Sequence, residues 1–402
     1  MISTATSDRE LAHARLRRVI ALHFDPKKGS PYWLERERRL GISVRREIRS
    51  VEDLALLGPM EAEALASRPI EDFIPAALLE RRTEFIVAET AGTLGRPKFA
   101  VHRADEFHAA FVEPFVRAAR RAGFPRDVNW LFIGPSGPHI IGKAARCCAQ
   151  AMGAPDPFTV DFDPRWAKKL PEGSFARTRY LEHLQAQALQ VLAAQRVGVV
   201  FSTPPVLEDL CGRMTPEKRE EIRGVHFGGM PVSNALRKRL ADMFPNAVML
   251  SGYGNTLFGM SPELAFRAGV NTPAVRGGRR QAPFYRVQRR GVRNAAPAST
   301  GRAEAETGID YYPHGARLVI RVIEQDGGDE VRLGRPVAYG ERGRVVVHRL
   351  DETQFIANMF ERDTAVRIPP RRDAVADGFV LDGIRDPQPI RSETVKPAMG
   401  LY

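Results

Sequence analysis

Cysteine is scarce in this sequence. The 402 residues contain three cysteines, Cys147, Cys148 and Cys211. Three are too few for a disulfide framework, and their spacing is not that of a structural zinc site. The sequence therefore predicts a reduced, cytoplasmic protein that holds no metal through its cysteines.

The chain also lacks long apolar runs. No stretch approaches the ~18 consecutive apolar residues of a membrane span, so neither a span nor a membrane partner is expected. Residues 1–24 carry charges among their apolar positions, unlike the core of a signal peptide, and predict an amphipathic helix instead. Internal repeats and low-complexity linkers do not stand out. With a hydrophobic content of 43%, the chain is expected to form one large domain or two unequal ones.

Positive charge is what the chain has in excess. A net charge of +12 favours anionic partners such as nucleotides, carboxylates or nucleic acid. The densest basic stretch, residues 276–294, interleaves Phe284 and Tyr285 with arginines, as a nucleic-acid-binding loop does. No helix-turn-helix, RNA-binding or zinc-finger pattern accompanies this stretch. A solvated insertion is therefore the favoured interpretation, and nucleic acid is not an expected partner.

Hydrophobic periodicity predicts the order of the elements. Residues 1–80 are expected to be helical, with prolines as punctuation. From residue 84 onward, short apolar strands alternate with amphipathic helices, with strands at 84–88, 128–134, 197–202, 225–229 and 247–254 and helices at 104–123, 180–196 and 232–244. This alternation predicts an α/β domain with a largely parallel sheet, whose ligands bind at the carboxyl ends of the strands. Strand-like runs between 310 and 370 lack intervening helices and predict a smaller β-rich subdomain.

The first predicted strand leads into the sequence ETAGTLGRPK, which is rich in glycine and threonine. Glycines let the backbone turn tightly and expose N–H groups to an anion, while hydroxyls and a lysine add donors and charge. The residues concerned are Thr90, Gly92, Thr93, Gly95 and Lys98. The glycine spacing differs from that of the Walker phosphate loop. Taken alone, the stretch is either a phosphate-binding loop or an ordinary polar turn.

Four further segments give this loop a context. ETAGTLGRPK resembles the phosphate-binding signature of the adenylate-forming superfamily, Ser/Thr-Ser/Thr-Gly-Thr-Thr-Gly-x-Pro-Lys. SGYGNTLFG resembles the Tyr-Gly-x-Thr-Glu motif of that superfamily, HFGGMPVS its Gly-Gly turn beside adenine, and MFERDTAVRI its Tyr-Arg-x-Gly-Asp segment. The N-terminal SPYWLERERRLGI resembles the opening of phenylacetate–coenzyme A ligases. All five occur in the family's order. The short chain with YGNTLFG in place of the usual motif also resembles the adenylating proteins of phenazine antibiotic biosynthesis.

The resemblance implies the large N-terminal domain of an adenylate-forming enzyme, with mostly parallel sheets flanked by helices. Residues 1–80 would be its helical segment, 81–305 the nucleotide- and acid-binding core, 306–385 the β-rich subdomain and 386–402 a hinge and tail. Family members continue into a mobile C-terminal domain that supplies a catalytic lysine. Only a short tail with Lys396 follows the hinge-like DGIRDP here, so we expect that domain to be absent.

The resemblance also implies where ATP or AMP binds. The triphosphate would lie along the loop, with adenine on Tyr253, the α-phosphate at Thr256 and the ribose at Asp363. The nucleotide-binding set is Thr90, Gly92, Thr93, Gly95, Lys98, Gly228, Gly229, Tyr253, Gly254, Thr256 and Asp363, and the catalytic set is Lys98, Thr256 and His139. Mg²⁺ is expected to accompany ATP. Leu257 replaces the motif's glutamate and cannot ligate a hard cation, so Glu263, Glu89 or water would have to substitute.

An aromatic carboxylic acid, such as a phenazine carboxylate, is the substrate that the resemblance implies. Its predicted pocket is formed by His139, Phe227, Gly229, Phe258 and Met260. Each has a plainer interpretation: His139 as a hydrogen-bonded histidine at a helix start, and the apolar residues as core packing.

Three functions follow from the resemblance. The first is an enzyme that forms an acyl-adenylate for a downstream reductase or acyl acceptor. The second is a coenzyme A ligase completed by a separate domain, and the third is a non-catalytic protein that binds the acid or the nucleotide. A homodimer is compatible with all three.

Overall fold

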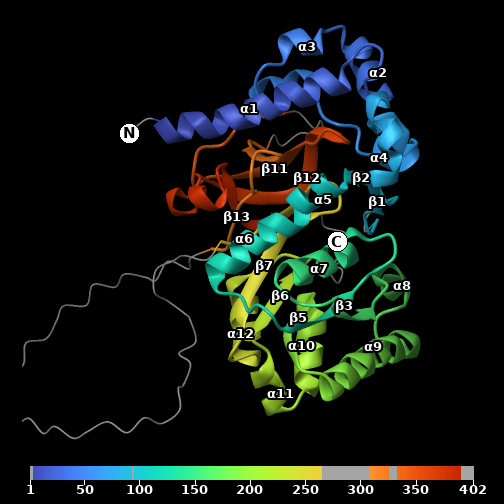
Figure 1. Ribbon diagram of the computed structural model, residues 1–402, viewed down its shortest axis with the longest axis vertical. Helices are drawn as coiled ribbons and strands as arrows, with labels where there is room; N and C mark the ends of the chain where they lie inside the picture. Colours follow the sequence, from blue (N-terminus) through green and yellow to red (C-terminus); the bar gives the residue numbers. More distant parts are fainter. Residues whose placement is uncertain (1–2, 93–94, 265–307, 326–332, 391–402) are drawn as a thin grey trace, which may run out of the picture.

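The computed structural model describes residues 3–92, 95–264, 308–325 and 333–390. Three groups of elements follow one another along the long axis of the molecule: N-terminal helices, an antiparallel sheet, and a mostly parallel sheet flanked by helices (Figure 1). The predicted mixed α/β fold with a separate β-rich part is therefore confirmed. No helix in these ranges combines the length and apolarity that a bilayer span requires.

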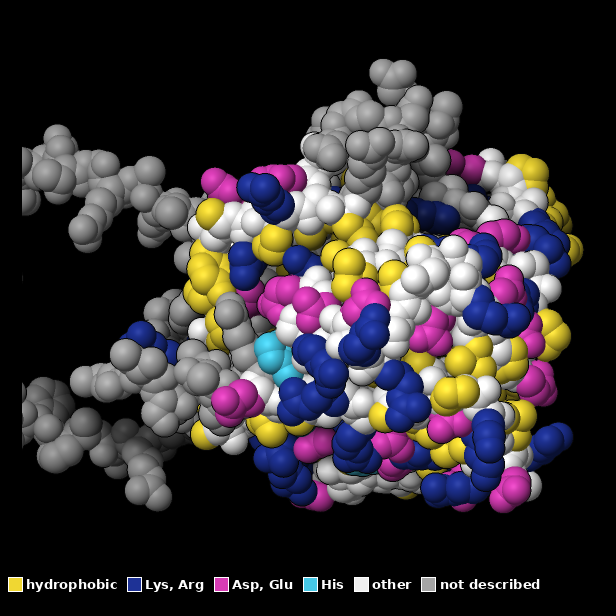
Figure 2. All heavy atoms as spheres, turned by 90° about the horizontal axis from the view of Figure 1, so that it is seen from above, with side chains coloured by type: hydrophobic (Ala, Val, Ile, Leu, Met, Phe, Trp, Pro, Cys, Tyr) yellow, Lys and Arg dark blue, Asp and Glu magenta, His cyan; other side chains and the backbone are white. Residues whose placement is uncertain are grey.

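The N-terminal segment is helical, as predicted. It contains α1 (Ser3–His23), α2 (Pro31–Leu40), α3 (Val44–Glu47), α4 (Ala64–Ser67) and the 3₁₀ turns η1 (Glu52–Leu57), η2 (Ile70–Phe73) and η3 (Ala76–Glu84). Trp33 packs on Phe355 of the antiparallel sheet with ring centroids 4.8 Å apart, and its Nε1 donates to the Phe355 carbonyl at 3.1 Å. Figure 2, which views this end of the molecule, shows basic and acidic side chains intermixed over the surface.

The strand expected at 84–88 is the one element with an unexpected partner. It forms β1 (Phe85–Glu89), which pairs antiparallel with β2 (Phe99–Arg103) in a two-stranded hairpin apart from the parallel sheet. A parallel neighbour needs a crossover of a dozen or more residues, whereas the loop 90–98 is short enough for a direct antiparallel return. The prediction that this strand lies in the parallel sheet was wrong for that reason.

The parallel sheet has the strand order β4-β3-β5-β6-β7-β8. Its strands are β3 (Asn129–Gly134), β4 (Phe158–Asp161), β5 (Val197–Ser202), β6 (Gly224–Gly228), β7 (Val248–Asn255) and the antiparallel edge strand β8 (Gly259–Pro262). Alternate residues of β3 enter different hydrophobic clusters, Leu131 and Ile133 on one face and Trp130 and Phe132 on the other. Both faces are therefore covered, as a parallel sheet requires.

Helices form the two covering layers. The face of Trp130 is covered by α6 (Glu113–Ala122) and α7 (Ile140–Ala151), and the opposite face by α9 (Phe175–Ala194), α10 (Pro204–Arg213) and α12 (Asn234–Met243). The remaining short helices are α5 (Ala104–Phe107), η4 (His108–Val112), α8 (Pro164–Lys169), α11 (Pro216–Glu221) and η5 (Arg372–Asp377). Ser233 caps α12, since its side chain accepts from the Leu236 N–H at 3.2 Å.

The antiparallel sheet has the order β10-β11-β12-β13-β9. Its strands are β9 (Asp310–Tyr311), β10 (Leu318–Ile323), β11 (Arg342–Leu350), β12 (Phe355–Ile368) and β13 (Gly383–Pro389). A bridge between Glu263 and Tyr311 joins it to the end of the parallel sheet. This junction brings β12 beside the carboxyl end of β7, where the loops of the predicted site gather.

Candidate active site

A pocket of about 200 Å³ lies at the junction of the two sheets. Its walls come from the turn after β6, the end of β7, and strands of the antiparallel sheet: residues 229–232, 252–254, Tyr311, Asp363, Pro387 and Pro389. Four predicted nucleotide-binding residues meet here, namely Gly229, Tyr253, Gly254 and Asp363. They come from three segments that are far apart in the sequence.

Tyr253 and Asp363 form the polar contact of this pocket. The Tyr253 hydroxyl donates to Asp363 Oδ2 at 3.0 Å. Burial, helped by the charge of Asp363, raises the pKa of Tyr253 well above its usual value, so the phenol stays a neutral donor. Gly229 turns the backbone with φ of 78°, a conformation that favours glycine. An aromatic ring, a carboxylate and a glycine turn are groups that suit a nucleoside.

Glu361 is a neighbour of this pair that the sequence interpretation missed. Its carboxylate accepts from Asn255 Nδ2 at 3.3 and 3.4 Å. Burial, together with the charge of Asp363, raises the pKa of Glu361 to about 8. Residues two apart in a strand share a face of the sheet. The spacing between Glu361 and Asp363 on β12 could therefore have indicated that Glu361 belongs to the site.

We expect nucleotide affinity to depend on the ionisation of Glu361. Above pH 8 the carboxylate adds a negative charge near Lys98 and the predicted triphosphate position, so ATP should bind several-fold more weakly at pH 9 than at pH 7. Folding stability should fall as the pH rises from about 4.5 to about 8, since over that range the folded state keeps a proton that the unfolded state has lost, and it should level off above pH 8. Calorimetric titration of ATP into wild type, Glu361→Gln and the control Glu341→Gln measures this. An equal pH dependence in Glu361→Gln would contradict it.

The predicted phosphate loop is closed at its base. The Thr90 N–H donates to the Lys98 carbonyl at 2.9 Å, and the Lys98 N–H donates to Thr90 Oγ1 at 3.0 Å. Gly92 has φ of 60°, and a Cβ there would lie 3.0 Å from the Gly95 carbonyl oxygen. Thr93 lies outside the described residues. The loop therefore begins and ends at a fixed point, with Lys98 on its rim.

Thr256 lies beside this base. Its Oγ1 donates to the Glu89 carbonyl at 3.5 Å, and His102 Nε2 contacts the Thr256 carbonyl at 3.2 Å. Leu257 is buried in the core, with its N–H bonded to Asn255 Oδ1 at 2.9 Å. The loop after β7 is thus held against the loop after β1.

Both predicted substitutes for the missing metal ligand already have partners. Glu263 accepts from Ser251 Oγ at 2.8 Å and pairs with Arg237 at 2.7 Å, while Glu89 pairs with Arg165. Within the described ranges, no three His, Cys, Asp or Glu side chains lie together so that they could hold a metal ion. Mg²⁺ in nucleotide sites usually keeps several waters and binds through one or two carboxylates and the substrate's phosphates, so an ion that accompanies ATP would be held mainly by the nucleotide and by water.

His139 lies at the start of α7 and is 3% exposed. Neither ring nitrogen has a hydrogen-bond partner, and the side chain does not cap the helix. Burial and the nearby Arg165 charge lower its pKa, which leaves a neutral imidazole with one donor and one acceptor. The Pro138 carbonyl accepts from the Glu89 N–H at 3.0 Å, so His139 lies close to the base of the phosphate loop. The plainer interpretation, a hydrogen-bonded histidine, does not fit these contacts.

The other predicted acid-pocket residues are in the core. Phe227 and Phe258 are buried in one hydrophobic cluster, and Met260 packs against the other. None of the three lines the 200 Å³ pocket, although Gly229 does. Gly228 ends β6 one residue before Gly229. An acid pocket formed by these apolar residues remains a prediction.

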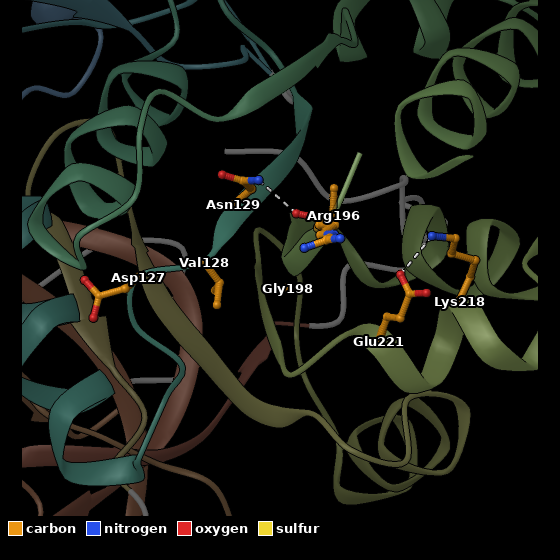
Figure 3. A pocket seen from close by; sticks show the side chains of 8 residues that line it. Asp127, Val128, Asn129, Arg196, Gly198, Lys218 and Glu221 are labelled. Carbon is orange, nitrogen blue, oxygen red and sulfur yellow. Dashed lines mark hydrogen bonds and ion pairs between the residues drawn. The ribbon is translucent and has the colours of Figure 1, made fainter. Parts of the chain in front are cut away.

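A larger hollow, of about 570 Å³, lies at the opposite end of the parallel sheet (Figure 3). It is lined by the amino ends of β3 and β5 and by α11, and its polar groups contact one another: Asn129 donates to the Arg196 carbonyl, and Lys218 pairs with Glu221. None of the predicted site residues lines it. Since α/β sheets bind ligands at carboxyl ends, the smaller pocket is the better candidate.

Comparisons with known proteins agree with this arrangement. No family model matches the chain. A stretch of 175 residues is 28% identical to the 2-succinylbenzoate–CoA ligase, chloroplastic/peroxisomal, of Arabidopsis thaliana, and covers 42% of this chain but only 27% of that protein. The structure is similar to an open conformation of 2-hydroxyisobutyryl-CoA ligase in complex with 2-HIB-AMP and CoA, with a TM-score of 0.62 and 14% identity over 96% of this chain and 70% of that one. The same ligase in its thioesterification state gives a TM-score of 0.60 with 16% identity, over 96% of this chain and 68% of that one. The chain therefore has the fold of the adenylate-forming, CoA ligase-like enzymes.

Proposed function

We propose that this protein binds ATP and a carboxylic acid and activates the acid as its acyl-adenylate, with release of pyrophosphate. The observation that carries the proposal is the 200 Å³ pocket, in which Gly229, Tyr253 and Asp363 converge from three distant segments. The similar ligase structure contains an acyl-AMP, which supports the same chemistry. An aromatic acid, such as a phenazine carboxylate in a biosynthetic pathway, is the proposed substrate class.

The side chains divide the work as follows. Asp363 accepts hydrogen bonds from the ribose hydroxyls, and Tyr253 packs on the base. Lys98 and backbone N–H groups of the phosphate loop offset the charge of the triphosphate, and the Thr256 hydroxyl would leave the Glu89 carbonyl to donate to the α-phosphate. An oxygen of the acid attacks the α-phosphorus, the bond from this phosphorus to the pyrophosphate oxygen breaks, and pyrophosphate leaves. The protein's contribution is to position and to stabilise charge.

ATP–pyrophosphate exchange with a panel of aromatic carboxylic acids, with and without Mg²⁺, tests this function. Exchange that depends on one acid is expected. Acyl-CoA formation on addition of coenzyme A would assign the transfer step to the same chain. Absence of exchange with every acid, at nucleotide concentrations that raise the melting temperature, would contradict adenylation.

Leu257 favours a second candidate, a non-catalytic protein that binds the acid or the nucleotide. It is buried in the core, and the nearby carboxylates of Glu263 and Glu89 are already paired. A binder needs the nucleoside pocket but no metal ligand. A rise in melting temperature with ATP or an acid, without pyrophosphate exchange, is the result that this candidate predicts.

We expect His139→Ala to lower kcat/KM for the acid by roughly ten- to a hundredfold, because a ligand would lose the hydrogen bond to the unpartnered imidazole. His139→Phe should be nearly as impaired, since it keeps the shape of the site without the polar atoms. The matched control is Lys143→Ala, an exposed position on the same helix, which should leave kcat/KM unchanged. Full activity in His139→Phe would instead show that the ring of His139 contributes by apolar packing and not by hydrogen bonding.

A further inference from the structure

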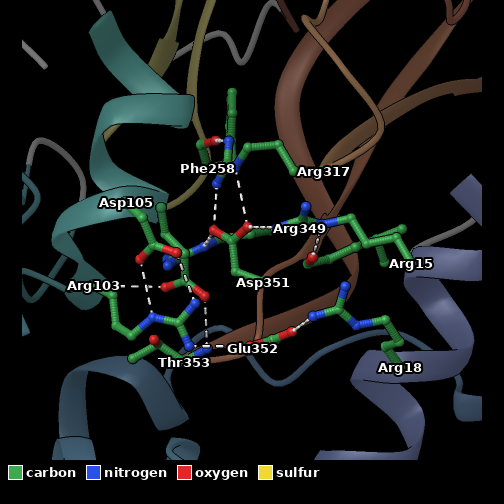
Figure 4. A network of polar contacts seen from close by, with 12 residues as sticks. Arg15, Arg18, Arg103, Asp105, Phe258, Arg317, Arg349, Asp351, Glu352 and Thr353 are labelled. Atoms are coloured by element: carbon green, nitrogen blue, oxygen red, sulfur yellow. Dashed lines mark hydrogen bonds and ion pairs between the residues drawn. The ribbon is translucent and has the colours of Figure 1, made fainter. Parts of the chain in front are cut away.

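Three charged side chains are buried together beneath the loop that carries Thr256. Arg349 and Asp351 have side chains that are fully buried, and Arg317 is 5% exposed. The Asp351 carboxylate accepts from Arg317 at 2.5 and 3.1 Å and from Arg349 Nε at 2.6 Å (Figure 4). Arg15 of α1 also reaches this carboxylate, at 3.1 Å. Asp351 therefore fixes the orientation of both buried guanidinium groups.

The remaining guanidinium donors reach two backbone carbonyls of the loop after β7, one backbone carbonyl of β2 and, from Arg349, the side-chain oxygen of Gln354 at 3.0 Å. Arg317 donates to the Phe258 carbonyl at 2.7 Å, and Arg349 donates to the Leu257 carbonyl at 3.0 Å. The other terminal nitrogen of Arg349 donates to the Val101 carbonyl at 2.5 Å. Val101 belongs to β2, the strand that leaves the phosphate loop. One guanidinium thus connects the loop that carries Thr256 with the strand that follows the phosphate loop.

Such an arrangement is a costly way to obtain stability. The free energy that two charges lose on leaving water is about as large as the free energy that their mutual attraction provides. Well-packed apolar side chains often stabilise a core as well or better. What a guanidinium offers, and an apolar side chain or a lysine does not, is a rigid fork of donors that sets two acceptors at a fixed separation. The geometry of Arg349 uses that property, since one acceptor belongs to the loop after β7 and the other to β2, the strand that follows the phosphate loop.

We propose that Arg349, held by Asp351 and assisted by Arg317, is a positioning residue that sets the distance between the Thr256 loop and the phosphate loop for nucleotide binding. The inference rests on the proposed function and deepens it. Arg349 would not touch ATP. It would place Thr256 and Lys98 so that both reach the same phosphate chain, and a change of an ångström in that spacing is enough to cost most of the rate.

Arg349→Lys tests the proposal, because it keeps the charge and removes the fork. We expect KM for ATP in pyrophosphate exchange to rise by about tenfold while KM for the acid changes less than twofold, at a temperature well below the melting point of every variant. Arg317→Lys, which loses a contact to one loop only, should show a smaller effect of the same kind. Arg18→Lys is the matched control, since Arg18 pairs with Glu352 at the exposed rim of the same network.

The melting temperature and its increase with ATP supply a second readout. In Arg349→Lys the increase with ATP should shrink while the increase with the acid persists. If both arginine variants melt earlier but keep the wild-type ratio of the two KM values and the wild-type ATP response, the network is structural and the inference is overturned. Should Arg349→Lys fail to fold, the ratio of KM for ATP to KM for the acid in Arg317→Lys tests the inference instead. A wild type with neither exchange nor an ATP response would overturn the proposed function, and the inference with it.

Discussion

Replacing Asp351 with asparagine should lower the free energy of unfolding by about 3–5 kcal/mol, a large part of the stability of an ordinary domain. The substitution leaves two buried guanidinium groups facing a neutral amide, and an uncompensated buried charge is among the most destabilising changes in a protein. Urea denaturation followed by circular dichroism measures the difference. The midpoint should fall while the slope stays constant, because the surface exposed on unfolding is unchanged.

The adjacent Glu352 provides the control for this prediction. Its side chain is 24% exposed and pairs with Arg18 and Arg103 near the surface, so Glu352→Gln should cost no more than about 1 kcal/mol. Equal losses in the two variants would show that burial of the charge does not matter here.

The dependence of folding stability on acid pH should reveal the contribution of the Asp351 carboxylate. Burial alone would raise the pKa of Asp351, but Arg317 and Arg349 outweigh it and hold the pKa well below its usual value. A carboxylate with a lowered folded-state pKa stabilises the fold above its unfolded pKa, which is about 3.9, and this contribution is lost as the pH falls through the folded-state value. The gap between wild type and Asp351→Asn should therefore be complete at pH 6 and narrow only below about pH 4.

Periodicity predicts the parallel sheet well because the signal is local. The runs that became β3, β5, β6 and β7 are short, apolar and separated by helices, and burial on both faces requires that pattern. The hairpin of β1 and β2 was missed since pairing partners depend on loop length and on tertiary contacts. A run such as Phe99–Arg103, with a charge and a histidine, carries little strand signal of its own.

The sequence likewise predicted some residues of the candidate site and gave no signal for others. Motif order indicated Tyr253, Gly229 and Asp363, and the structure brings all three to one pocket. Arg349 and Asp351 gave no comparable signal, because their partners are scattered along the sequence: Arg349 donates to Val101 on the hairpin, and Asp351 accepts from Arg15 and Arg317. Charges inside an apolar strand run, as in VVVHRLDE, were the only hint, and their pairing appears only after the chain has folded.

Asp363→Ala should weaken ATP binding by about a hundredfold, since charge-assisted hydrogen bonds contribute about 1.5–3 kcal/mol each. Loss of affinity alone would not identify the contact, because the substitution also removes the acceptor of the Tyr253 hydroxyl. A comparison of the affinities for ATP and for its 2′- and 3′-deoxy analogues would identify the contact with the ribose. Wild type should prefer ATP by about tenfold or more over at least one analogue, and Asp363→Ala should lose that preference, since no carboxylate remains to accept from the ribose.

Two further variants separate this contact from a general defect of the β-rich part. Tyr253→Phe removes the hydroxyl but keeps the ring, so it should weaken ATP only a few-fold and retain the preference over the deoxy analogues. Asp373→Ala changes an exposed carboxylate that pairs with Arg371 and Arg121 and does not line the 200 Å³ pocket, so this variant should bind ATP like wild type. If Asp363→Ala binds ATP weakly but still discriminates against the deoxy sugars, the carboxylate supports Tyr253 rather than the ribose. The nucleoside would then have to be placed by the Gly229 turn and the aromatic ring alone.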